Sequence, residues 1–147
     1  MVGPTRISPR PTSKARWSRV LACGLLAGVV WIILGSLVTA LLGSTFAALP
    51  NNRLGHPTPG FICLNAVIDL LEGISIMWLY AVLRPLYGAG GRTAVIAALA
   101  WWIIISLGDA TWCSFGLFPP RTVIPLVIGT LPALMLAALA GAKMYRD

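Results

Sequence analysis

The chain has 147 residues, of which 58% are hydrophobic and only 10% are charged, and its mean hydropathy is +0.86. About 25% of the residues of a soluble domain are charged, so this composition excludes an ordinary soluble domain and is typical of a membrane protein. The net charge of +7 comes with no nucleic-acid-binding motif. We therefore expect no nucleic-acid partner, and we attribute the cations to membrane topology and to anionic lipid headgroups.

The N-terminal segment, residues 1–19, holds three prolines and five cations and has almost no apolar pattern. It cannot bury enough apolar surface to order itself, so we predict a disordered basic tail. Residues 20–42 form an uninterrupted apolar run that is long enough to cross a bilayer as a helix. A cleaved signal peptide is less favoured, because secretory apolar cores span only about 7–15 residues. Gly24, Gly28 and Gly35 form a stripe that predicts close contact with a neighbouring helix.

Three further spans follow the first. Residues 43–60 are rich in Pro, Gly and Asn and predict an exposed loop. The second span is predicted at residues 61–83. Pro85 follows it directly and should stop the helix. The third is predicted at about 94–113 and the fourth at about 122–141.

Small residues recur every four positions in the fourth span, at Gly129, Ala133, Ala137 and Gly141, and predict close helix packing. Pro125 and Pro132 should bend this helix. The whole pattern predicts an all-α polytopic domain over residues 20–147, with four transmembrane helices in an up-down bundle.

The cations are distributed unevenly between the two ends of the predicted bundle. Five lie in the tail, two in the turn 84–93 and two at the C-terminal end, whereas the other two loops hold only Arg53 and Arg121. Because cytoplasmic loops carry an excess of Lys and Arg, this distribution predicts that both termini are cytoplasmic.

Three of the four acidic residues, Asp69, Glu72 and Asp109, lie inside predicted spans. Asn65, Asp69 and Glu72 share one helix face by their spacing. Asp109 belongs to the antiparallel third span at a similar predicted depth, so the three carboxyls could converge. Arg121 is the nearest candidate cation. Ionisable residues within the membrane are costly and usually functional, so we predict a polar or proton site at these positions.

Two interpretations of this site stay open. The first is a proton- or cation-exchanging site. The second is a set of neutral carboxyls that hold helices together by hydrogen bonds to Asn65, Ser75, Ser106 or Thr111. Such bonds contribute about 0.6 kcal/mol on average.

The three cysteines contain no CxxC pair and are too scattered for a zinc site, so we expect no metal. Cys63 and Cys113 are predicted near the same face of the membrane. Two alternatives stay open for these cysteines: a disulfide between them in an oxidising compartment, or two free thiols.

The junction between the second and third spans reads Trp78-Leu79-Tyr80-Ala81, then Arg84-Pro85, Tyr87-Gly88, Gly90 and Arg92-Thr93-Ala94. It resembles the WLYA…RP.YG.G..TA junction of small uncharacterised four-helix bacterial integral membrane proteins, and the likeness covers about residues 73–102. The resemblance implies four helices and the bacterial inner membrane, and it brings no activity. The aromatic residues of the junction are expected to anchor the helices at the membrane interface.

Neither a nucleophile–base pair nor a cofactor motif is present, so we predict no catalytic residues and no cofactor. The favoured interpretation is a non-enzymatic structural or accessory membrane subunit, as a homo-oligomer or in a larger complex. The alternative is a small proton- or cation-coupled transporter that acts as an oligomer.

Overall fold

The computed structural model describes residues 13–43, 45 and 58–145, and this part of the chain is helical apart from the turns between the helices. Its long helices are α1 (Ser13–Leu41), α3 (Pro59–Tyr87), α4 (Gly91–Ser114) and α5 (Pro120–Met144). Each is long and apolar enough to cross a membrane. The predicted all-α class is therefore confirmed, and each of the four predicted spans corresponds to a helix of sufficient length and apolarity.

Two helix ends differ from the sequence-based expectation. Helix α1 begins at Ser13, so residues 13–19 belong to the helix, while residues 1–12 of the predicted tail lie outside the described residues. Helix α3 continues through Pro85 and ends at Tyr87. A proline in the last turn removes only one backbone donor, whereas Gly88 adopts a φ of 84° that ends the helix.

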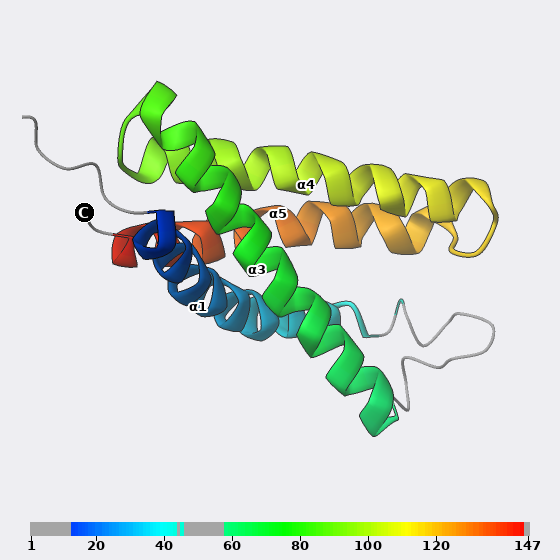
Figure 1. Ribbon diagram of the computed structural model, residues 1–147. Helices are drawn as coiled ribbons and strands as arrows, with labels where there is room; N and C mark the ends of the chain where they lie inside the picture. Colours follow the sequence, from blue (N-terminus) through cyan, green and yellow to red (C-terminus); the bar gives the residue numbers. More distant parts are fainter. Residues whose placement is uncertain (1–12, 44, 46–57, 146–147) are drawn as a thin grey trace, which may run out of the picture.

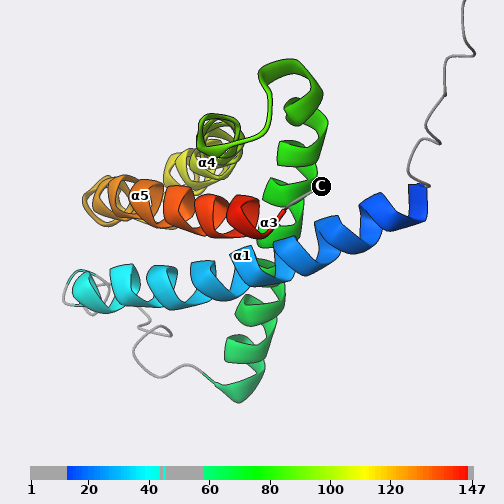
Figure 2. The same cartoon turned by 90° about the vertical axis from the view of Figure 1, so that its left-hand side faces the viewer.

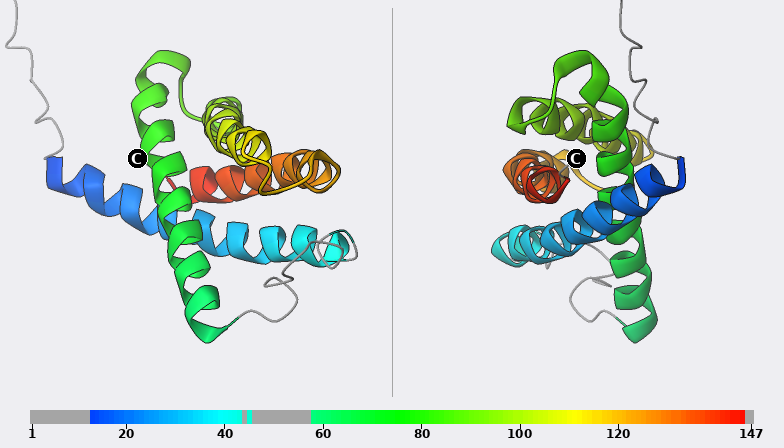
Figure 3. Two further views of the ribbon diagram at one scale, coloured as in Figure 1. Left: turned by 90° about the vertical axis from the view of Figure 1, so that its right-hand side faces the viewer. Right: turned by 60° about the vertical axis from the view of Figure 1, so that its left-hand side comes forward.

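In Figure 1, the axis of α3 is oblique to the axes of the other three helices. Helices α4 and α5 lie side by side, α1 lies along the other side of α5, and α3 runs obliquely across them (Figure 1). The views in Figures 2 and 3 show the same crossing of α3 over α1 and α5. Among the described residues, no Cα atom of α1 lies within 8 Å of a Cα atom of α4.

Helices α1 and α3 cross with their backbones in contact at three glycines. A Cβ atom on Gly24 would lie 2.5 Å from the Cα of Ile74, and one on Gly28 would lie 2.8 Å from the Cα of Leu70. A Cβ atom on Gly73 would overlap the backbone of both α1 glycines. The predicted stripe is confirmed at Gly24 and Gly28. It is wrong at Gly35, whose side of the helix meets only Trp31 of the same helix.

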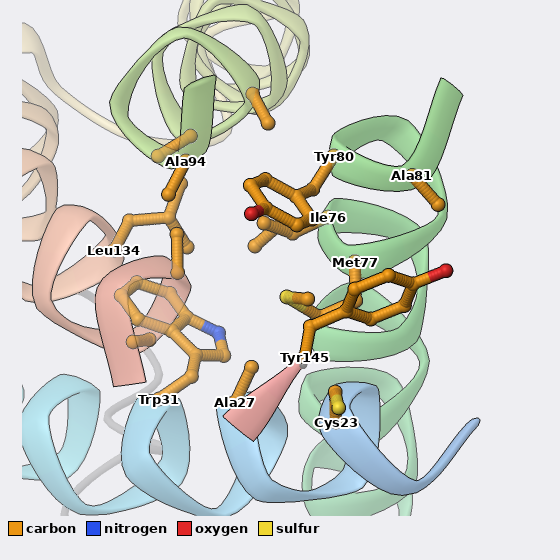
Figure 4. Packing of buried hydrophobic residues seen from close by; sticks show 14 of the residues in the cluster. Cys23, Ala27, Trp31, Ile76, Met77, Tyr80, Ala81, Ala94, Leu134 and Tyr145 are labelled. Atoms are coloured by element: carbon orange, nitrogen blue, oxygen red, sulfur yellow. The ribbon is translucent and has the colours of Figure 1, made fainter. Parts of the chain in front are cut away.

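Helix α5 packs through the small residues that the sequence singled out. Ala133, Ala137 and Gly141 are buried, and a Cβ atom on Gly141 would lie 3.0 Å from the carbonyl oxygen of Cys23 in α1. Pro125 and Pro132 are both accommodated within one continuous helix. The core around this contact is drawn in Figure 4, where Met77 and Ile76 of α3 face Leu134 of α5.

Tyr80 lies in this core, although its place near the end of a span predicted an interfacial anchor. It is 1% exposed, its hydroxyl accepts a hydrogen bond of 3.2 Å from the backbone N–H of Gly90, and its ring meets the edge of Tyr145 at 5.6 Å. The guanidinium of Arg84 lies 5.4 Å from the centre of the Tyr145 ring. The expectation is therefore wrong for Tyr80, which ties the α3–α4 turn to α5, whereas Trp78 is exposed as expected.

The bundle divides into two halves of opposite charge. The basic half carries Arg19, Arg84, Arg92 and Lys143, and it comprises residues 17–28, 73–87, 91–101 and 133–145. The acidic half comprises residues 29–41, 59–72, 102–114 and 120–132, and it carries Asp69, Glu72 and Asp109 with a single cation, Arg121. Among the described residues of the acidic half, Trp31, Thr122 and Val123 are buried. The other buried residues of the four helices lie in the basic half.

Candidate intramembrane carboxyl site

The predicted polar face of α3 follows the helix out of the core. Ile76 is completely buried, Glu72 and Asp69 are half-buried, and Asn65 is exposed. This order arises because the α1–α3 contact at Gly73 lies at the inner end of the face. The two carboxyls therefore lie where α3 leaves the packed part of the bundle.

The polar side chains that were expected to bond these carboxyls are engaged elsewhere. The amide of Asn65 donates to the carbonyl of Phe61 at 2.9 Å, and the hydroxyl of Ser75 donates to that of Leu71 at 2.8 Å. The hydroxyl of Thr111 likewise donates to the carbonyl of Leu107 at 2.9 Å. Within a helix, such local bonds compete successfully with contacts to a neighbouring helix.

Ser106, the fourth expected partner, has a buried hydroxyl with no hydrogen-bond partner in the structure. None of the four therefore bonds a carboxyl. The four partners that the sequence offered for helix-to-helix hydrogen bonds are therefore not used for them in the structure.

Trp31 of α1 is the side chain that meets the carboxyls. It follows Gly28 by three positions and so continues the same face of α1, and Gly28 itself lies against Leu70 and the carbonyl of Asp69. The ring is 7% exposed and lies close to Leu134 and Ala27 in Figure 4. Its indole N–H has no partner at full hydrogen-bond geometry, and the groups that it approaches are the carboxyls of Asp69 and Glu72.

Asp109 of α4 completes the set at longer range. Glu72 lies within electrostatic reach of both other carboxyls and interacts more strongly with Asp69 than with Asp109. The described residues include no group of three or more His, Cys, Asp or Glu side chains close enough to hold a metal ion. The carboxyls are thus arranged as a pair with a third, more distant member.

Arg121 lies apart from this pair. It is exposed in the first turn of α5, and the structure contains no ion pair between it and the carboxyls of the described residues.

The structure contains Cys63 and Cys113 as free thiols. Cys63 is exposed near the start of α3, Cys113 lies near the end of α4, and these two helix ends diverge in Figures 1 and 3. The disulfide stays a prediction that would require the two ends to approach each other.

Trp31 is the site residue that the sequence-based reasoning missed. A signal was present, because it is the only aromatic residue of the apolar run 20–42 and lies near the middle of that run. Membrane tryptophans are enriched at the interfaces, so a central one indicates a polar partner for its N–H.

Searches of protein-family models, curated proteins and solved structures found no match to this chain. The function is therefore argued from the residues themselves.

Proposed function

We propose that this chain is a multi-pass membrane protein that binds and releases a proton at Asp69 and Glu72, as the core of a small proton-coupled transporter. The observation that carries the proposal is the state of this pair. Two carboxyls lie in the middle of an apolar helix, half-buried, and without a bond from the hydroxyl and amide groups nearby. Ionisable groups are costly within a membrane, so their presence there indicates a functional role.

A proton suits this site better than a metal ion. A hard cation needs about six oxygen ligands, and the described residues offer no cluster of three carboxyl-type ligands. A proton needs only one oxygen at a time, and two neighbouring carboxyls can share it.

The orientation and the assembly belong to the same proposal. Nine Lys and Arg residues against two favour both termini in the cytoplasm, and the junction resemblance favours the bacterial inner membrane. Half-exposed carboxyls in lipid also favour a homo-oligomer or a larger membrane complex, in which a second surface covers them.

The test is proton flux in proteoliposomes that contain the purified full chain. We expect pH-gradient-driven flux in the wild type and its loss in Asp69→Asn and Glu72→Gln. Asn65→Ala serves as the matched control, because Asn65 lies on the same helix face but bonds only its own backbone. Absence of flux in the wild type, or unchanged flux in both carboxyl variants, contradicts the proposal.

A structural or accessory subunit is the second candidate. It is favoured by the first two turns of α3, where Phe61, Ile62 and Leu64 are all exposed and extend beyond the core. In this case the carboxyls would hold helices or partners together, so Asp69→Asn and Glu72→Gln would lower the free energy of unfolding in detergent. Full stability of both variants would exclude this role for the carboxyls.

A further inference from the structure

We propose that the indole N–H of Trp31 positions the Asp69–Glu72 pair, by donating a hydrogen bond to whichever carboxyl has lost its proton. This inference rests on the proposed function and adds α1 to the site. Trp31 would act through the carboxyls and is therefore a positioning residue.

The burial of Trp31 supports this role. With 7% of its surface exposed, the ring lies in the core, yet its N–H has no partner at full hydrogen-bond geometry. Buried donors without a partner are rare in proteins. Because Gly28 on the same face lies against the backbone of Asp69, the carboxyls of Asp69 and Glu72 are within reach of this donor. A carboxyl accepts a hydrogen bond more strongly when it is ionised.

The α1–α3 crossing holds the ring in this position. Gly28, one turn earlier in α1, lies against the carbonyl of Asp69, and a Cβ atom there would be 3.1 Å from that oxygen. The backbones are in contact at this point, so neither helix can withdraw without breaking the glycine contact. The crossing thereby holds the backbones that carry the indole and the carboxyls close together.

The charged environment of Glu72 is simple. Helix α3 contributes Asp69 and α4 contributes Asp109, while α1 contributes the neutral indole of Trp31. Helix α5 has no titratable residue between Arg121 and Lys143. Among the described residues, the N–H of Trp31 is therefore the group whose interaction favours a negative charge on the pair.

The step itself transfers one proton. In the protonated state, both carboxyls carry an O–H and the pair is neutral, and one of these O–H groups gives up its proton. When that proton passes to water, the O–H bond breaks and its electron pair stays on the carboxylate oxygen, which then accepts the N–H of Trp31. Protonation reverses the change and weakens the hydrogen bond from the N–H.

The first test compares Trp31→Phe with Trp101→Phe in the full chain in lipid nanodiscs. Both variants remove a buried, unpartnered indole N–H and keep an aromatic ring, but Trp101 does not interact with the carboxyls. Loss of a donor to an anion should shift the pH midpoint of proton release upward by about one unit in Trp31→Phe, which is a tenfold higher proton affinity. Trp101→Phe should leave the midpoint unchanged. Equal midpoints in all three proteins would overturn the inference.

A second measurement uses the wild type alone. In the wild type, the indole N–H resonance of Trp31 should move with pH at the same midpoint as proton release. A resonance that stays constant while the protein releases its proton would overturn the role of Trp31 and leave the proposed function standing. A wild type that releases no proton at all would overturn both.

Discussion

The basic and acidic halves of this bundle are built from similar apolar sequence but pack very differently. In the basic half, Gly24, Gly28 and Gly73 bring two backbones into contact, and Gly141 brings in a third helix. In the acidic half, α3 leaves the other helices and its large side chains, such as Ile62 and Leu64, are exposed. The carboxyls lie at the outer end of this close contact, which reaches Leu70 and the carbonyl of Asp69.

This difference separates two uses of membrane helices. Glycine and alanine at a crossing increase backbone contact, which is the main source of helix association where lipid is as apolar as leucine. A helix that departs from its neighbours gives up that contact, and the space it leaves is where polar groups can exchange with water or a partner. The basic half therefore provides stability, and the acidic half provides the candidate chemistry.

The largest expected effect is at the glycine crossing. Gly73→Leu should lower the free energy of unfolding by about 3 kcal/mol or more, the upper range for overpacking, because its side chain would meet rigid α1 backbone. Unfolding in detergent titrations measures this loss. Gly108→Leu in α4 is the matched control, since no atom lies within 4 Å of its Cβ position. Equal stabilities of the two variants would contradict the described packing.

A smaller effect is expected at the α3–α4 turn. Tyr80→Phe removes the acceptor of the Gly90 N–H and should lower the free energy of unfolding by about 1 kcal/mol. The exposed Tyr87 provides the comparison, and Tyr87→Phe should change the stability by less than about 0.5 kcal/mol. The same detergent titration measures the free energy of unfolding of both variants. A Tyr80→Phe variant as stable as the wild type would show that the turn does not depend on this bond.

Within the acidic half, Asp109 should matter less than the pair. Asp109→Asn is expected to shift the pH midpoint of proton release by less than Asp69→Asn does, because Glu72 interacts more strongly with Asp69 than with Asp109. Proton release into a weakly buffered solution measures both shifts. A larger effect of Asp109→Asn would place the centre of the site between α3 and α4.

The smallest expected change is at the cysteines. The ends of α3 and α4 that carry Cys63 and Cys113 diverge, so the intact mass of the purified chain should be the same with and without reductant. A mass lower by two hydrogens without reductant would mean that the acidic half closes further than described.

The sequence predicts those features that depend on local composition. Long apolar runs fix the spans, and the glycine spacing in the first run indicated its contact face, because both are properties of a single helix. The oblique course of α3 was not predictable, because it depends on how Gly73 fits against a partner that pattern analysis does not place. The same reason explains the error at Tyr80, where an aromatic residue near a span end suits an interface equally well.

Only part of the candidate site was predictable, because only part of it depends on the spacing within a single helix. The shared face of Asn65, Asp69 and Glu72 follows from helical spacing. The engagement of Asn65 by its own backbone and the approach of Trp31 depend on three-dimensional placement.

The central claim is that the Asp69–Glu72 pair takes up and releases a proton. Infrared difference spectroscopy of the full chain in nanodiscs tests it most directly, through the C=O stretch of a protonated carboxyl recorded across a pH titration. We predict a band that titrates in the wild type and is lost in the double variant Asp69→Asn, Glu72→Gln. A band that is identical in the wild type and the double variant would contradict the claim.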